Sequence, residues 1–270
     1  MTEVLARGSR IQALHVRPPA YAAMSECLRI QSTARKPSWL ARLLGQNPIE
    51  PDARSWYRGA LGELQVARTL AALPDTWTVL HHSPAALEDA SPIDHVVIGP
   101  AGVFTIATKN HAGQRVWVDD ERILVNGHRT NHIADARHEA AHLSRVLGAG
   151  DDGPVTPILT IVDPATLIVD RKRSSRVLVI PAHRLARTLL RLPRTASDAA
   201  VAALVLRAEL GGTWTATTSR LDDSLRHEAR FLRLKAEVDA AWQRRVAWVV
   251  AVSATAVLMV LWSAAGTFTG

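Results

Sequence analysis

The sequence predicts an α/β protein of the α+β sandwich type, with helices flanking a sheet and one transmembrane helix near the C-terminal end. Three observations predict this fold class. A helical apolar pattern over residues 56–73 precedes several short runs rich in Val, Ile and Thr, which are typical of strands. Two of these runs flank the turn "GPAG", which is a hairpin signature. Finally, residues 246–265 contain no charged side chain.

The elements of the body follow in order from local patterns. Apolar residues recur at helical spacing up to Leu73, and Pro74 ends the pattern. The run "TWTVLHH" predicts a strand, and "PIDHVVIG" and "VFTIATK" predict the two strands of the hairpin. Further strands are predicted over 114–120, 122–127, 155–162, 166–169 and 176–181, and further helices over 132–147, 182–192 and 197–210.

These elements divide the chain into four regions. Residues 1–50 contain several prolines and are expected to be weakly structured, although "WLARLL" at 39–44 could form a short amphipathic helix. Residues 51–185 form the predicted globular domain, and residues 186–245 form a helical region that ends in a charged juxtamembrane stalk. Residues 246–265 are the predicted transmembrane helix.

The C-terminal apolar run has the length and the flanks of a membrane span. At about 1.5 Å per residue, a helix of this length covers roughly the 30 Å of a bilayer's hydrocarbon core. Trp248 and Trp262 lie near its ends, where interfacial aromatic residues are enriched. Because Arg244 and Arg245 precede the run and no charged side chain follows it, the positive-inside rule places the body in the cytoplasm, anchored to the cell membrane. A buried core helix is the alternative interpretation.

The composition is that of a basic globular protein. The chain has 32 Lys and Arg residues against 25 Asp and Glu residues, which gives a net charge of +7. This excess suits a polyanionic partner or an anionic membrane face, and equally an ordinary basic surface. The single cysteine, Cys27, excludes an intramolecular disulfide and fits a reducing compartment.

A candidate site lies where the hairpin strands meet. Alternate residues of a strand share one face, so Lys109 and position 107 point the same way, and the hairpin brings Asp94 near them. Glu63, on the preceding helix, adds a second carboxylate if that helix covers this face. Phosphodiester hydrolysis needs hard oxygen ligands for a divalent metal and a cation that stabilises developing charge. Position 107, where a metal-dependent nuclease would place a carboxylate, is Ala107.

Two stretches of the sequence resemble a known family. "YRGALGELQVARTLAAL" and "PIDHVVIGPAGVFTIATKN", in this order, resemble the NERD (nuclease-related) domain, a branch of the PD-(D/E)xK nuclease superfamily. The resemblance covers roughly residues 56–170. It implies a restriction-endonuclease-like core with flanking helices.

The resemblance also implies roles for particular residues. It makes Asp94 and Glu63 the ligands of Mg²⁺ or Mn²⁺ and Lys109 the motif lysine, in a nuclease that cuts DNA or RNA. Ala107 departs from the family pattern, which has an acid at this position. The resemblance thus implies a degenerate PD-(D/E)xK site.

The missing acid leaves several interpretations open. Asp94 and Glu63 could hold a metal with the help of water, because Mg²⁺ needs only one or two carboxylates. A carboxylate could also come from Asp119 or Asp120 on the next strand. Alternatively, the domain is a non-catalytic, membrane-tethered module that binds nucleic acid or serves as a scaffold.

Two residues after the motif lysine are candidates for binding nucleic acid. Asn110 and His111 follow Lys109 directly and could reach a phosphate group. The expected partners are therefore nucleic acid and, through the C-terminal helix, the membrane. The sequence gives no indication of protein partners.

A second motif indicates a different chemistry. Residues 138–142 read "HEAAH", and on a helix His138 and His142 lie one turn apart, as zinc ligands of a metalloprotease do. Glu139 would then be the general base. No third ligand follows at the spacing such proteases use. Polar residues on the exposed side of a helix are the favoured interpretation.

Overall fold

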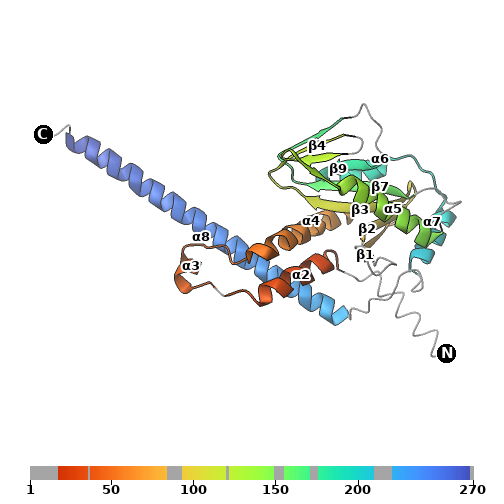
Figure 1. Cartoon of the computed structure of the whole chain (residues 1–270), viewed down its shortest axis with the longest axis horizontal. Helices are drawn as coiled ribbons and strands as arrows, with labels where there is room; N and C mark the ends of the chain where they lie inside the picture. Colours follow the sequence, from red (N-terminus) through yellow and green to blue (C-terminus); the bar gives the residue numbers. More distant parts are fainter. Residues whose placement is uncertain are drawn as a thin grey trace.

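The protein has a body of two sheets and several helices, and one long helix leaves this body towards the C-terminal end (Figure 1). The predicted class, a mixed sheet with flanking helices and one long apolar helix, is confirmed. The computed structural model describes residues 18–35, 37–83, 93–119, 122–148, 155–170, 176–209 and 221–267.

The central sheet has five strands in the order β1-β2-β3-β7-β9. The first three are antiparallel neighbours, whereas β7 runs parallel to β3 and β9 runs parallel to β7. The predicted hairpin is confirmed, with Gly99 opposite Gly102 at its turn. Gly102 has a φ of 116°, a conformation that side-chain-bearing residues rarely adopt. The strands are β1 (Thr78–Ser83), β2 (Ile93–Gly99), β3 (Gly102–Asn110), β7 (Thr156–Val162) and β9 (Leu178–Pro181).

A second, smaller sheet has the strand order β6-β5-β4-β8. Its apolar residues Val116 and Ile123 share a core with Leu159 and Ile161 of the central sheet. The short strand β6 was not predicted, because "HRT" has no apolar alternation and gains its place only by pairing with β5. The strands are β4 (Arg115–Val118), β5 (Ile123–Val125), β6 (His128–Thr130) and β8 (Thr166–Val169).

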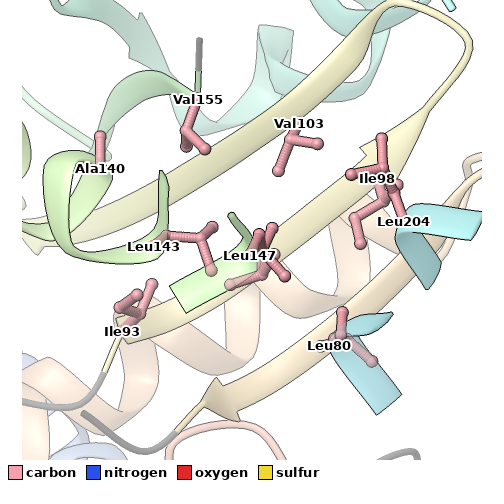
Figure 2. Close-up of a cluster of buried hydrophobic side chains, with 11 residues drawn as sticks. Leu80, Ile93, Ile98, Val103, Ala140, Leu143, Leu147, Val155 and Leu204 are labelled. Carbon is pink, nitrogen blue, oxygen red and sulfur yellow. The ribbon is translucent and has the colours of Figure 1, made fainter. Parts of the chain in front are cut away.

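Two helices cover one face of the central sheet. Ile98 and Val103 of the hairpin pack there against Leu143 and Leu204 (Figure 2). Gly148, with a φ of 59°, ends the first of these helices where the sequence predicts. The helices are α5 (His132–Leu147) and α7 (Asp198–Glu209).

The opposite face of the sheet is covered by other helices. Val97 and Phe104 of the hairpin pack there against Val66 and Leu70. Successive residues of β2 and β3 thus alternate between two apolar layers, as expected for a sheet buried on both sides. The covering elements are α4 (Arg54–Leu70), the 3₁₀ turn η2 (Ala182–Arg184) and α6 (Leu185–Arg191).

The N-terminal residues pack against the long C-terminal helix. Met24 and Cys27 are fully buried in one cluster with Tyr57 and Phe231, whose ring centroids lie 5.4 Å apart. Part of the segment that the sequence leaves without clear organisation therefore forms a helix with its own core. The elements are α2 (Tyr21–Ser32), α3 (Trp39–Leu43), the 3₁₀ turn η1 (Pro51–Ala53) and α8 (Leu221–Thr267).

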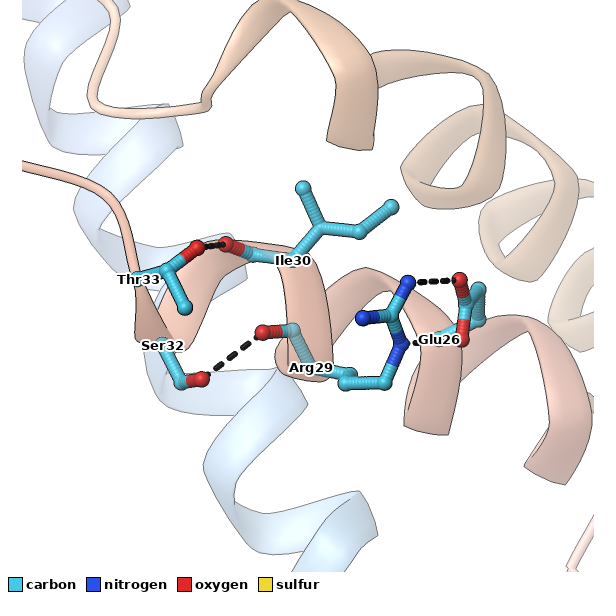
Figure 3. A network of polar contacts seen from close by, with 5 residues as sticks. All are labelled: Glu26, Arg29, Ile30, Ser32 and Thr33. Carbon is cyan, nitrogen blue, oxygen red and sulfur yellow. Dashed lines mark hydrogen bonds and ion pairs between the residues drawn. The ribbon is translucent and has the colours of Figure 1, made fainter.

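Polar contacts within α2 stabilise its C-terminal half (Figure 3). Arg29 donates two hydrogen bonds to the Glu26 carboxylate, at 2.8 Å and 2.6 Å. The hydroxyls of Ser32 and Thr33 donate to the carbonyls of Arg29 and Ile30 at the C-terminal end of the helix. The Ile30 carbonyl also accepts from the Thr33 backbone N–H. Solvent screens an exposed ion pair of this kind, so burial of the apolar side holds α2 in place.

The helix α8 contains both the predicted stalk and the predicted membrane segment without a break. It is long and apolar enough over Leu225–Trp262 to cross a membrane. Its side chains from 242 to 262 are all exposed, so the body does not bury the apolar stretch. The alternative of a buried core helix therefore finds no support.

Candidate active site

The Asp94 carboxylate lies between the two strands of the hairpin. Its Oδ2 accepts a hydrogen bond of 2.7 Å from the backbone N–H of Thr108, which holds the carboxylate beside β3. Burial raises the pKa of the Asp94 carboxyl, while the Thr108 hydrogen bond and the Lys109 charge act to lower it. The net result is an Asp94 pKa above the ordinary value, so the protein stabilises the negative charge of Asp94 less well than water does.

Position 107 lies in the core between the central sheet and α5. Ala107 is only 2% exposed and shares an apolar cluster with Ile133 and Ala136 of α5. Its methyl group offers no ligand atom. Lys109, two residues further along β3, lines the cavity described below.

Different helices lie beside position 107 and Asp94. Ala107 packs against α5, whereas the cavity that Asp94 lines is also lined by Trp56, Arg58 and Glu63 of α4. The helix that carries Glu63 therefore lies beside the Asp94 cavity but does not pack on position 107. A helical pattern does not specify which face of a sheet the helix will cover.

Glu63 nevertheless reaches the site from α4. The preceding residue, Gly62, brings the helix close to β3, since a Cβ added there would lie 3.0 Å from the Asn110 Cβ. Burial raises the pKa of the Glu63 carboxyl well above its ordinary value, and the Asp94 charge raises it further. Lys109 and a backbone hydrogen bond from Ala20 act in the opposite direction. The structure thus brings the three predicted residues close enough for their charges to interact.

A third carboxyl group, that of Glu139 of α5, interacts electrostatically with Asp94 and Lys109. It lies one helical turn after Ala136, which shares the Ala107 cluster, and therefore on the side of α5 that faces the sheet. The pKa of the Glu139 carboxyl is raised to about 8, mainly by burial and also by the Asp94 charge, while the Lys109 charge acts to lower it. Its Oε2 is buried and accepts no hydrogen bond from the residues that the structure describes.

The structure does not support the favoured interpretation of the "HEAAH" stretch. Of its three polar residues, His138 is exposed, whereas Glu139 is half-buried and His142 is buried. The sequence does contain a signal for this arrangement, because the apolar residues Ile133, Ala140 and Leu143 define a buried stripe beside Glu139. That signal was obscured by the resemblance of the stretch to a zinc motif.

The residues after Lys109 form a polar network. The Asn110 side-chain amide donates to the Arg58 backbone carbonyl at 2.7 Å, which ties β3 to α4. The two imidazoles of His111 and His132 meet with their Nε2 atoms 3.2 Å apart, and His111 Nδ1 lies 2.8 Å from Gln114 Oε1. Burial lowers the pKa of His132 to about 4, and the charge of Lys109 contributes to the same shift. These histidines are therefore neutral at pH 7.

A cavity of about 480 Å³ opens over these residues. Glu63, Asp94, Thr108 and Lys109 line it. Side chains suited to nucleic acid also line it, including a half-exposed tryptophan for stacking and one arginine for a phosphate group. These further lining residues are Trp56, Arg58, Asn110, His111, Gln114 and His132.

The other candidate ligands do not complete this centre. Asp119 closes the turn between β4 and β5, where its carboxylate accepts from the Arg122 backbone N–H and pairs with the Arg122 side chain at 3.5 Å. Asp120 lies outside the described residues. Within the described ranges, no three His, Cys, Asp or Glu side chains, those of "HEAAH" included, are close enough together to form a preassembled metal site.

Comparison with known families identifies the part of the chain that carries this centre. Residues 58–162 match the nuclease-related domain family (NERD). The resemblance inferred from the motifs is confirmed over this segment, which is less than half of the 270 residues. The matched NERD segment begins within α4, ends with β7, and contains the three carboxylates, Lys109 and position 107.

One relative among curated proteins is an uncharacterized protein of Bacillus anthracis. It is 42% identical over 82 residues, which cover 29% of this chain and 37% of that protein. The chain thus spans little more than a third of the relative's length. No solved structure matches the chain significantly.

Proposed function

We propose that this protein is a membrane-anchored, metal-dependent nuclease whose missing strand carboxylate is replaced by Glu139 of α5. The proposal is supported above all by the buried Glu139 Oε2, which has no hydrogen-bond partner among the described residues and belongs to a carboxyl group that interacts electrostatically with Asp94. A buried acceptor without a partner is costly, and such atoms often belong to functional sites. In this proposal α5, which packs over β3, supplies the acid that the family pattern has on β3.

The chemistry of the donor set fits Mg²⁺ or Mn²⁺. Three carboxyl groups with raised pKa values interact with one lysine, so the centre lacks positive charge, and hard oxygen atoms are the ligands these ions take. Glu63, Asp94 and Glu139 would hold the ion once their side chains converge on it. When bound, such an ion would polarise the phosphodiester and lower the pKa of an attacking water.

The other residues of the cavity bind and position the substrate. Lys109 lies beside the carboxylates, where an amine neutralises charge that develops on phosphate oxygens. Arg58 and the exposed ring of Trp56, at the rim, suit a phosphate and an unstacked base respectively. Nucleic acid, DNA or RNA, is therefore the proposed substrate.

The long helix α8 supplies the proposed anchor. Its exposed apolar stretch has the length of a bilayer span, and Arg244 and Arg245 precede it. With these cations on the cytoplasmic side, the nuclease-related domain lies in the cytoplasm at the cell membrane.

Cleavage assays on the full chain in detergent test this function. We expect single- or double-stranded DNA or RNA to be cut with Mg²⁺ or Mn²⁺, and EDTA or Asp94→Asn to abolish cutting. Asp75→Asn, at an exposed position before β1, is the matched control and should cut like wild type. Cutting that survives Asp94→Asn would overturn the assignment.

A second candidate function is a non-catalytic module that binds nucleic acid. It is favoured by Ala107 and by the lack of a preassembled metal site in the described part of the chain. In that case the same preparations would bind nucleic acid with an affinity that falls steeply with salt, and none would cut.

A further inference from the structure

The short helix α3 presents an apolar surface to solvent. Trp39 is 72% exposed, and three leucines of α3 and its C-terminal end are at least half exposed. Four large apolar side chains on consecutive turns form a patch that soluble proteins rarely leave uncovered. The patch consists of Trp39, Leu40, Leu43 and Leu44.

The helix α3, which carries this patch, lies beside α8 (Figure 1). Trp248 Nε1 donates to the Leu43 carbonyl at 2.9 Å, and Arg244 Nη1 donates to the Arg42 carbonyl at 2.9 Å. Gly45 continues the contact, because a Cβ there would lie 2.5 Å from the Ala241 carbonyl oxygen of α8. The position of α3 along α8 is therefore determined by three separate contacts.

Basic side chains surround a cavity next to this contact. The cavity, of about 520 Å³, lies between α2, α3 and α8 and is lined by Arg35, Arg42 and Arg244. Glu237 is the acidic residue among its lining side chains. Two positive charges thus remain uncompensated where α8 changes from charged to apolar.

We propose that α3 lies in the headgroup region of the cytoplasmic leaflet, with its apolar patch inserted and the three arginines in contact with anionic lipid phosphates. The bilayer is the partner that fits, because hydrogen bonds hold the patch beside α8 where the exposed apolar side chains of that helix begin. Trp248 lies in the first turn of that apolar stretch, at the depth where interfacial tryptophans lie. An interfacial amphipathic helix combines the same features, apolar residues on one side and cations beside them.

This arrangement has a consequence for the active site. The N-terminal segment that carries α2 and α3 also contacts the candidate active site. The backbone N–H of Ala20 donates a hydrogen bond to Glu63, and Ala23 lines the active-site cavity. With α8 across the bilayer and α3 on its surface, the domain is held at two points and cannot swing freely. The inference rests on the proposed membrane anchor.

Depth-dependent quenching in vesicles tests the inference. The full chain with Cys27→Ala receives one cysteine by Leu40→Cys, Leu258→Cys or Leu190→Cys, and each cysteine carries an environment-sensitive fluorophore. Leu190, on α6 of the body, is exposed like Leu40 and serves as the matched control. In vesicles that contain lipids with a nitroxide near the headgroup, we expect quenching at position 40. In vesicles that contain lipids with a nitroxide deep in the acyl chain, we expect quenching at position 258, and in neither case do we expect quenching at position 190.

The possible results separate the two proposals. Quenching at 258 without quenching at 40 would overturn the placement of α3 and leave the anchor intact. Absence of quenching at both positions would overturn the anchor and the inference with it. Quenching at 40 alone would show that the patch binds lipid without a span and would also contradict the anchor.

Lipid charge tests the role of the arginines. Quenching at position 40 should increase when neutral phosphatidylcholine vesicles receive phosphatidylglycerol. Arg35→Gln with Arg42→Gln should remove this increase, whereas Arg187→Gln with Arg191→Gln on α6 should not. Equal quenching in neutral and anionic vesicles for the parent protein would show that the arginines do not recognise lipid phosphate.

Discussion

At position 107 a methyl group occupies the place of an acid, and Glu139 of α5 has a buried Oε2 without a hydrogen-bond partner among the described residues. Ala107 and Ala136 share one apolar cluster, which allows α5 to lie close to β3. Glu139, one turn further along, then faces the pair of Asp94 and Lys109. A small residue on the strand is thus compatible with a helix that approaches closely enough to deliver the carboxylate itself.

Two glycines of α4 give a matched test of its close approach to β3. At Gly62 an added Cβ would lie 3.0 Å from the Asn110 Cβ, whereas at Gly59 it would meet nothing within 4 Å. Gly59→Ala should therefore stabilise the helix by about 0.5–1 kcal/mol. Gly62→Ala should melt at a lower temperature than Gly59→Ala, because the same gain is offset by overpacking. Equal melting temperatures would contradict the tight contact.

We expect burial of His81 to make the protein less stable in acid. Burial lowers the pKa of His81 to about 4, against about 6.5 in the unfolded chain. The unfolded state then binds more protons between these values, so the contribution of His81 is fully present above pH 6.5 and is lost as the pH falls towards 4. His81→Gln should reduce the drop in melting temperature between pH 7 and pH 4.5. An unchanged drop would contradict this role.

At the scale of elements, α5 joins the sheet core to the site. The buried apolar residues of α5 pack on the hairpin and on α7. The half-buried Glu139 lies beside these residues on the same helix. The functional position of Glu139 therefore depends on apolar packing further along the helix.

Replacing a leucine by alanine should lower the free energy of unfolding more when the leucine is more deeply buried. Leu143 is fully buried between the sheet and α7, so Leu143→Ala should lower the free energy of unfolding by about 2–5 kcal/mol. Leu206 of α7 is 58% exposed, and Leu206→Ala should change it by about 0.5 kcal/mol or less. Denaturant unfolding of both variants measures the difference, and similar losses would contradict the assigned core.

Local patterns predicted most elements but not their mutual arrangement. The hairpin and α5 follow from alternation, turn residues and helical spacing, all of which lie within a few residues of one another. The contacts of α2 and α3 with α8 join residues about two hundred positions apart, and no local pattern contains them. The sheet face that α5 covers depends on tertiary packing in the same way, which is why the favoured interpretation placed Glu139 on the exposed side of a helix.

At the scale of the whole molecule, one continuous helix connects the nuclease-related domain to its proposed anchor. Phe231 and Leu234 of α8 lie in the core with α2, and the helix continues from there into the exposed apolar stretch. A rigid helix transmits the orientation of the membrane segment to the body more directly than a flexible linker would.

Charges in the apolar stretch should release the protein from the membrane. Val257→Asp with Leu258→Asp places two acids at the centre of the proposed span, at a cost of about 2.5–3.5 kcal/mol each. Most of the variant should then appear in the soluble fraction after alkaline washing. Leu225→Asp, an exposed position before the apolar stretch, should remain with the membrane. Retention of the doubly charged variant would contradict a span.

Titration of the full chain with Mn²⁺ tests the central claim most directly, because it measures the proposed ligand set without requiring turnover. The account predicts binding by wild type, weakening by about tenfold or more in Glu139→Gln, which is about 1.4 kcal/mol, and recovery when Ala107→Glu is combined with Glu139→Gln. Thermal melting verifies that each variant is folded. Mn²⁺ affinity that is unchanged in folded Glu139→Gln would contradict the claim that Glu139 replaces the missing acid.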